Sequence, residues 1–113
     1  MQIRYREENQ IHIFHLEGPF TQEKIKIIKP KVIPLLEMGP NTKVLFSFKQ
    51  VTFVDSSGFG EMVTWAQRAK KIQCVLAFCE FLEPITKMLQ IAKLDKYLTI
   101  YLTEADALQA LQK

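Results

Sequence analysis

The sequence predicts an α/β fold, with a mixed sheet of four or five strands flanked by about four helices. Short apolar or alternating segments, typical of strands, take turns along the chain with segments whose apolar residues recur every three or four positions, typical of helices. Strands that alternate with helices pair in parallel through right-handed crossovers. Two alternating segments at the start predict a hairpin, which makes the sheet mixed. A length of 113 residues fits one domain, residues 1–113.

The expected strands differ in how many of their faces are covered. The first two alternate apolar and polar side chains, the period of a half-buried strand, and Asn9 supplies turn chemistry in the EENQ segment between them. The fourth, CVLAF, is almost wholly apolar, as expected of a strand that is buried on both faces. In chain order the strands are expected at residues 2–6, 11–18, 43–48, 74–78 and 97–102.

Helices are expected between these strands. The segment 58–71 carries a stripe of apolar residues along one side, and its last turn is basic, which suits the helix dipole. Trp65 lies at the edge of that stripe, where it either belongs to the core or faces a partner. Thr103 can cap the last helix, which we expect to bury Leu108 and Leu111.

The segment 22–38 also keeps a helical period of apolar residues. Pro30 and Pro34 inside it each remove a backbone donor and clash with the preceding turn. We therefore expect either a kinked helix or two short helical pieces in this part of the chain.

The charge of the chain gives little support to nucleic-acid binding. The net charge is +3, which is only mildly basic. A basic run in the first third of the chain has no interleaved aromatic residues that could stack on bases, so a solvated helix face is the preferred interpretation. The run consists of Lys24, Lys26, Lys29 and Lys31.

The cysteines and the apolar runs favour a cytoplasmic protein. Cys74 and Cys79 are five apart, a spacing that fits neither a redox pair nor a zinc site, and their apolar surroundings predict buried free thiols. Free thiols suit a reducing compartment. No apolar run reaches the roughly 18 residues of a membrane helix, and the N-terminus has no signal-peptide pattern, so we expect no membrane insertion.

The stretch FVDSSGFGE, residues 53–61, lies where a strand ends and a helix begins. The first N–H groups of a helix lack internal partners, so they can donate hydrogen bonds to a capping side chain or to an anion. The structural interpretation makes Ser57 the N-cap and Ser56 a turn residue.

A catalytic or metal-binding role is disfavoured. There is no GxSxG elbow, and nothing in the spacing orients His12 or His15 toward Ser56. The two histidines are three apart and so point to opposite faces of a strand, which prevents joint metal ligation. We therefore expect no enzyme activity, no catalytic residue, no metal and no cofactor.

The segment VTFVDSSGFGEMV closely resembles the signature of STAS domains of the anti-sigma factor antagonist type, and the resemblance extends over nearly the whole chain. It implies a small α/β domain with a four- or five-stranded sheet. It also implies that the serine directly after the aspartate, Ser56, is phosphorylated by a partner kinase that is itself the anti-sigma factor. Asp55, Ser57, Gly58 and Phe59 would complete the motif and the surface that faces the partner.

The chain departs from the family pattern at two places. The family often has Gly-x-Leu-Asp after the second strand, whereas this chain keeps Gly18 and has Phe20 and Thr21 in place of Leu-Asp. That aspartate belongs to the partner-facing surface in the family. The Gly-Gly that precedes the fourth strand in the family is replaced by KKIQC.

Two functions follow from the resemblance. In the first, the unphosphorylated protein sequesters an anti-sigma serine kinase and releases it once Ser56 is phosphorylated, and a serine phosphatase restores the free form. In the second, the protein is a STAS scaffold subunit of a larger assembly, such as a stressosome-like complex or a lipid-transport ATPase. The intact Asp55-Ser56-Ser57-Gly58 favours the first, because a scaffold needs no acceptor hydroxyl.

Overall fold

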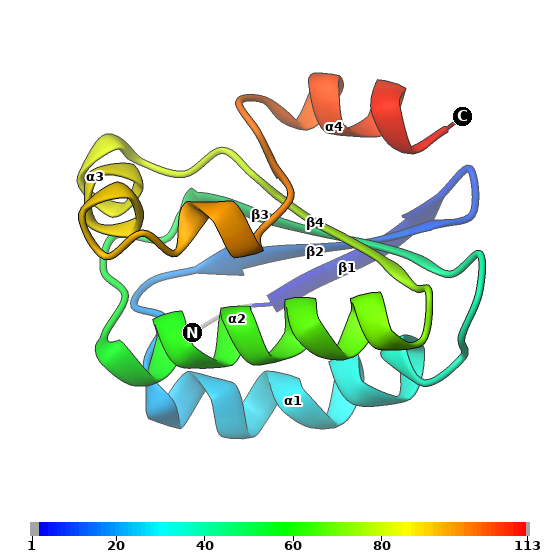
Figure 1. The fold of residues 1–113 in the computed structure, drawn as a ribbon, viewed down its shortest axis with the longest axis horizontal. Coiled ribbons are helices and arrows are strands. Elements are labelled where there is room, and N and C mark those ends of the chain that lie inside the picture. Colours follow the sequence, from blue (N-terminus) through cyan, green and yellow to red (C-terminus); the bar gives the residue numbers. More distant parts are fainter. Residues whose placement is uncertain (1–2, 113) are drawn as a thin grey trace.

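The computed structural model describes residues 3–112 (Figure 1). Gln2, the first residue of the expected strand 2–6, lies outside the described residues. A short 3-10 segment, η1, spans Asp95–Tyr97. The other elements, in chain order, are β1 (Ile3–Glu8), β2 (Ile11–Glu17), α1 (Gln22–Leu36), β3 (Lys43–Gln50), α2 (Ser56–Lys71), β4 (Val75–Cys79), α3 (Glu83–Ile91), β5 (Ile100–Tyr101) and α4 (Glu104–Leu111).

The five strands form one mixed sheet in the order β1-β2-β3-β4-β5, which confirms the expected fold class. β1 and β2 pair antiparallel, and every later neighbour pairs in parallel. Asn9 and Gln10, with φ of 51° and 66°, form the turn of the opening hairpin. Left-handed conformations at both central positions match the right-handed twist of the strands, as in a type I′ turn.

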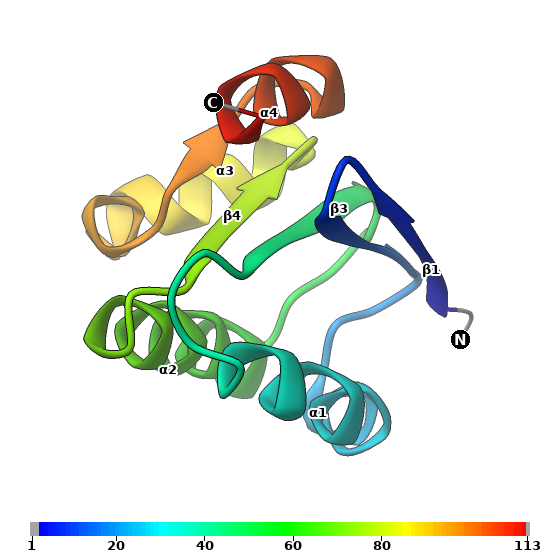
Figure 2. The ribbon, with the colours of Figure 1, turned by 90° about the vertical axis from the view of Figure 1, so that its right-hand side faces the viewer.

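Because the spatial order of the strands follows the chain order, crossovers of one hand place their helices on the same face of the sheet. Helices α1, α2 and α3 pack there with the sheet in one large apolar cluster, the larger core. Helix α4 covers the opposite face (Figure 2). Its buried residues Ala107 and Leu111 contact Ile11, Ile13 and Leu45 in the smaller core. Leu108, which was expected to be buried, is only partly so.

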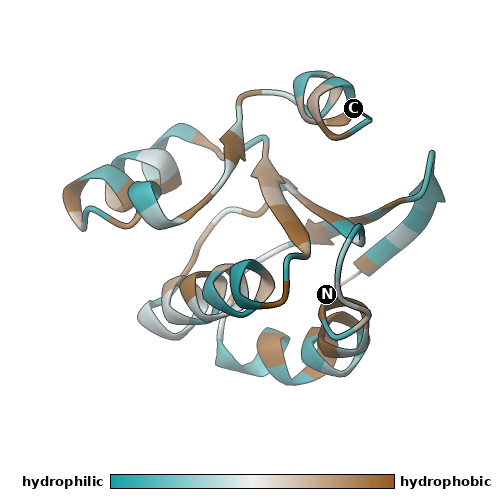
Figure 3. Ribbon diagram, turned by 45° about the vertical axis from the view of Figure 1, so that its right-hand side comes forward, coloured by the Kyte–Doolittle hydropathy of each residue, from teal (hydrophilic) through white to brown (hydrophobic). Residues whose placement is uncertain are grey.

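Stacked aromatic rings form the centre of the larger core. Phe46 on β3 stacks on Trp65 of α2 with ring centroids 5.2 Å apart, and on Phe14 and Phe78 of the neighbouring strands. Trp65 is fully buried, so it is a core residue and does not face a partner. The hydrophobic colouring of the central strands agrees with this arrangement (Figure 3).

Helix α1 is continuous, so the alternative of two short pieces was wrong. Pro30 and Pro34 are four residues apart and both are exposed, so they share the outer side of the helix. Pro30 has no N–H, so the carbonyl of Lys26 lacks its usual donor within the helix. Lys26 is also exposed, so this carbonyl can bond to water instead. The inner side holds the helix against the sheet through Ile25, Ile28, Val32 and Leu36.

The last strand is shorter than the sequence predicted. The segment expected at 97–102 is a strand only at Ile100–Tyr101, and Tyr97 belongs to η1. β5 therefore pairs with only two residues of β4, Phe78 and Cys79. The expected cap of α4 is confirmed, because the Thr103 side chain accepts a hydrogen bond from the backbone of Asp106 at 3.0 Å.

Candidate functional site

The beginning of α2 is held against the segment that enters α1. Val54 forms an isolated parallel bridge with Phe20. The N–H of Phe20 donates to the carbonyl of Phe53 at 2.7 Å, and the N–H of Asp55 donates to the carbonyl of Phe20 at 3.4 Å. These contacts join the two segments that lead into α1 and α2, at the left of Figure 1, and we call the joined segments the platform.

Asp55 caps helix α2. Its Oδ1 accepts a hydrogen bond from the backbone N–H of Gly58 at 2.8 Å, and its backbone is extended, as an N-cap requires. The prediction that Ser57 is the N-cap was therefore wrong: Ser56 and Ser57 are the first two residues of the helix itself. Aspartate caps a helix as well as serine does, so the sequence allowed both assignments.

Both serine side chains are exposed at this helix terminus. Within residues 3–112, no hydrogen-bond partner is found for the hydroxyl of Ser56 or of Ser57. The N–H of Gly58 donates to Asp55, while the N–H groups of the first two helical residues have no acceptor within α2. The dipole and these donors favour a negative charge at this position, and the nearby Asp55 carboxylate opposes it.

Gly58 is required by close packing. A Cβ at this position would lie 2.5 Å from the carbonyl oxygen of Phe20 and 2.8 Å from Cγ1 of Val54. Gly60 is different, because a Cβ there would meet nothing within 4 Å. The first glycine of the motif thus fixes the position of α2 on the platform, and the second leaves the helix surface open.

The exposed aromatic residue beside the serines is Phe53, which sequence reasoning missed. Phe53 is 56% exposed, whereas Phe59 is half-buried and packs against the larger core. Phe59 therefore contributes to packing, and its place on the partner-facing surface stays a prediction. No periodicity marked Phe53, because the run 51–54 is irregular and its exposure depends on the bridge between Val54 and Phe20.

The two departures from the family pattern play structural roles here. Phe20 is fully buried and fills the place of the leucine. Thr21 is the N-cap residue of α1, without a hydrogen bond from its side chain to the helix. At the replaced Gly-Gly, Gln73 adopts φ of 63°, the left-handed conformation that glycine usually supplies after a helix.

The two histidines lie on opposite faces of β2, and neither contacts Ser56. His12 bonds to the hydroxyl of Tyr5, with 2.6 Å between Nδ1 and the oxygen. On the other face, Nε2 of His15 lies 2.8 Å from Nη1 of Arg6 and 3.3 Å from Oε1 of Glu104. No group of three or more potential metal ligands occurs within the described part of the chain.

The basic run is not wholly a solvated face, as the sequence had suggested. Lys24 is buried, and its Nζ donates to the carbonyl of Glu17 at 3.1 Å. Burial lowers the pKa of Lys24, while the Glu17 carboxylate acts in the opposite direction. Lys26, Lys29 and Lys31 are exposed, as expected. In residues 3–112, no helix is long and apolar enough to span a bilayer.

Comparisons with known proteins agree with this geometry. A curated anti-sigma F factor antagonist from Paenibacillus polymyxa is 22% identical over 112 residues, which cover 99% of this chain and 96% of that protein. The structure of a candidate anti-sigma factor antagonist from Thermotoga maritima has a TM-score of 0.87 at 20% identity, covering 98% of this chain and 95% of that one. The phosphorylated form of the Bacillus cell fate determinant SpoIIAA has a TM-score of 0.73 at 15% identity, covering 97% and 99%.

A sequence model of the STAS domain matches residues 2–107. The match covers the hairpin, the platform that holds Asp55 and Ser56, and the first half of α4. The chain belongs to the STAS domain family.

Proposed function

We propose that this protein is an anti-sigma factor antagonist whose binding to an anti-sigma serine kinase is switched by phosphorylation of Ser56. One observation carries the proposal: Ser56 is an exposed first residue of α2 with an unengaged hydroxyl, at a helix terminus that Asp55 caps. The relatives that are named as anti-sigma factor antagonists support the same role. Asp55, Ser57 and the exposed Phe53 would surround the acceptor on the partner-facing surface, and the buried Gly58 would hold α2 in place beneath them.

The position of Ser56 suits a modification that leaves the fold intact. A phosphate adds about −1.5 to −2 charges. At the beginning of α2 this charge meets free N–H groups and the favourable end of the helix dipole, and Asp55 offsets part of that gain. We therefore expect Ser56→Asp to keep the circular dichroism spectrum and to melt close to the wild type.

Regulation then acts on binding. A neutral hydroxyl is buried in an interface at modest cost, whereas a dianion that is buried without a matched cation costs several kcal/mol. A loss of about 3 kcal/mol weakens affinity by roughly a hundredfold. The unmodified protein would hold the kinase, transfer of phosphate to Ser56 would end the complex, and a serine phosphatase would restore it. The protein itself needs no catalytic residue, metal or cofactor for this cycle.

The deciding experiment uses the candidate anti-sigma kinase with ATP. We expect one phosphate on Ser56 by phosphopeptide mapping, none in Ser56→Ala, and normal labelling in Ser57→Ala, the matched control with an equally exposed hydroxyl. In calorimetric titration, the wild type and Ser56→Ala should bind the kinase, while Ser56→Asp should bind roughly a hundredfold more weakly. Phosphate on Ser57 alone would refute the assigned acceptor.

The same titration separates the switch from the scaffold. Equal affinities for all three Ser56 forms would eliminate the switch and favour a STAS subunit of a larger assembly, such as a stressosome-like complex or a lipid-transport ATPase. Both roles are compatible with one domain over residues 1–113 and with action in the cytoplasm, where such a kinase would be found. Neither role requires contact with nucleic acid or insertion into a membrane.

A further inference from the structure

The outer edge of β4 is only partly covered by β5. On its inner side β4 pairs with β3 along its full length, beginning at Val75. On its outer side, β5 pairs only with Phe78 and Cys79. The N–H of Phe78 donates to the carbonyl of Thr99 at 2.9 Å, and before Thr99 the chain turns away into η1.

Leu76 is a buried residue whose backbone groups point toward this uncovered edge. In a parallel ladder, the N–H and C=O groups of alternate residues point to the same side of the strand. Leu76 is two residues before Phe78, so its N–H and C=O point to the side of β5, beyond the place where β5 begins. In the part of the chain that the structure describes, no backbone partner for Leu76 is found on that side.

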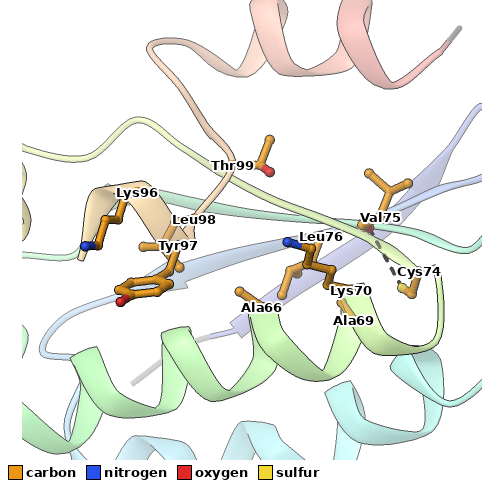
Figure 4. A pocket seen from close by; sticks show the side chains of 10 residues that line it. All are labelled: Ala66, Ala69, Lys70, Cys74, Val75, Leu76, Lys96, Tyr97, Leu98 and Thr99. Carbon is orange, nitrogen blue, oxygen red and sulfur yellow. Dashed lines mark hydrogen bonds between the residues drawn. The ribbon is translucent and has the colours of Figure 1, made fainter. Parts of the chain in front are cut away.

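A groove of about 380 Å³ lies along this edge (Figure 4). Ala66 and Ala69 of α2 line it with small side chains, and Tyr97 and Leu98 line it from the segment that precedes β5. Leu76 lies between these two sides.

The charge at the groove is of one sign. Among residues 3–112, the charged residues that line it are Lys70 on α2 and Lys96 on η1, and no carboxylate does so. Within residues 3–112, neither lysine takes part in an ion pair. Lys96 instead lies over the ring of Tyr97, with Nζ 5.2 Å from the centroid. The groove therefore complements an acidic partner.

We propose that this groove binds a short, extended, acidic segment of a partner protein, which pairs with β4 beside Leu76 in line with β5. Backbone pairing to an exposed sheet edge supplies two hydrogen bonds at Leu76, and alternate side chains of the segment face the alanines and the lysines. The site is distinct from the surface around Ser56, because Ala66 lies about 15 Å further along α2. The inference goes beyond the proposed switch and does not depend on it.

The test is a titration of the 15N-labelled protein with the blocked pentapeptide acetyl-DVEVD-amide, followed by NMR. We expect amide shifts at Leu76 and Thr99, and hydrogen exchange at Leu76 that slows at least tenfold at saturation. The amide of Ala77 faces β3 and should keep its exchange rate, so it serves as an internal control. The matched peptide acetyl-KVKVK-amide, which has the same backbone but the opposite charge, should not bind.

Charge variants test the rim of the groove. Lys70→Glu and Lys96→Glu should each weaken the acidic peptide roughly fivefold, in line with exposed ion pairs. Lys71→Glu, a neighbouring exposed residue outside the lining, should leave binding unchanged. Circular dichroism of each variant confirms that the fold is retained.

Three results would overturn the proposal. Absence of binding at millimolar peptide would do so directly. Peptide binding that leaves hydrogen exchange at Leu76 unchanged, and that inorganic tripolyphosphate reproduces, would show a nonspecific anion-binding patch. Protection of Leu76 in the free protein that rises with protein concentration would show that a second copy of the chain occupies the edge.

Discussion

Gly58 lies so close to Phe20 that a single added carbon atom would overlap the neighbouring backbone: a Cβ on Gly58 would be 2.5 Å from the Phe20 carbonyl oxygen. That oxygen also accepts the hydrogen bond from the N–H of Asp55. The contact therefore joins the motif at the beginning of α2 to the residue that replaces the leucine of the family pattern. The two glycines of the motif, Gly58 and Gly60, therefore differ in the space that is left for a side chain.

Gly58→Ala should destabilise the protein by about 2 kcal/mol or more, because the backbone on both sides must move apart. Gly60→Ala is the matched control: its Cβ would meet nothing within 4 Å, and alanine favours a helix over glycine by roughly 0.5–1 kcal/mol. Urea denaturation measures both. Similar stabilities for the two variants would contradict the close packing of Gly58.

The two phenylalanines of the motif should separate binding from folding. Phe53→Ala removes an exposed ring, so we expect little change in stability and roughly tenfold weaker binding to the kinase of the proposed function. Phe59→Ala removes a ring that packs on the larger core and should lower the free energy of unfolding by about 1–2 kcal/mol. Calorimetry measures the binding of both variants and thermal melting measures their stability. Weaker binding in Phe59→Ala with unchanged binding in Phe53→Ala would show that Phe59, and not Phe53, contacts the kinase.

His15 should make stability depend on pH. Burial lowers its pKa from 6.5, Arg6 and Arg4 act in the same direction, and Glu104 opposes them. The unfolded chain then binds the proton more readily, so stability is full above 6.5 and falls as the pH decreases from 6.5 toward the lowered pKa. His15→Gln should flatten this part of the curve. An unchanged slope in His15→Gln would refute the assignment.

Both thiols should be inert in the folded protein. Burial, together with Glu104 and Glu80, raises the pKa of Cys79 to about 12, although a hydrogen bond with Ser47 acts in the opposite direction. Burial also raises the pKa of Cys74. Because the thiolate is the reactive form, we expect almost no reaction with a thiol reagent at about pH 8 until urea unfolds the chain. Fast labelling of the native protein would reveal local opening, and single Cys→Ser variants would locate it.

Gln73 is a position where glycine should improve stability. Its φ of 63° costs about 1–2 kcal/mol for a residue with a side chain, and the N–H of Cys74 closes the helix end by bonding to Ala69. Gln73→Gly should raise the free energy of unfolding by up to about 1 kcal/mol. Gln67→Gly, inside α2, should lower it by about the same amount. A loss of stability in Gln73→Gly would contradict the predicted strain.

The sequence predicted the order of the elements and the mixed sheet, because periodicity and turn chemistry are local signals. It failed where tertiary contacts decide. Pro30 and Pro34 remain inside one helix because both lie on its outer side, a fact that depends on how α1 packs. The first residue of the last strand depends on how far η1, which includes Tyr97, keeps the chain away from the sheet.

The candidate site was found by its motif, but its details required the structure. The choice between Asp55 and Ser57 as the cap is set by backbone geometry, because both side chains are good acceptors. Trp65 lies on the edge of a stripe, and only the stack with Phe46 places it in the core. The exposure of Phe53 follows from a bridge between segments that are distant in sequence.

The order of the strands has a consequence for synthesis of the chain on the ribosome. Each strand pairs with the one that precedes it in the chain, so every new strand meets a partner that has already emerged. Domains that fold through such sequential pairing avoid waiting for distant segments. The smaller core is the exception, because Ile11, Leu45 and Ala77 remain uncovered until α4, the last element, leaves the exit tunnel. The nascent chain would therefore need protection from aggregation on this face until α4 emerges, and a truncation before Thr103 would make that need permanent.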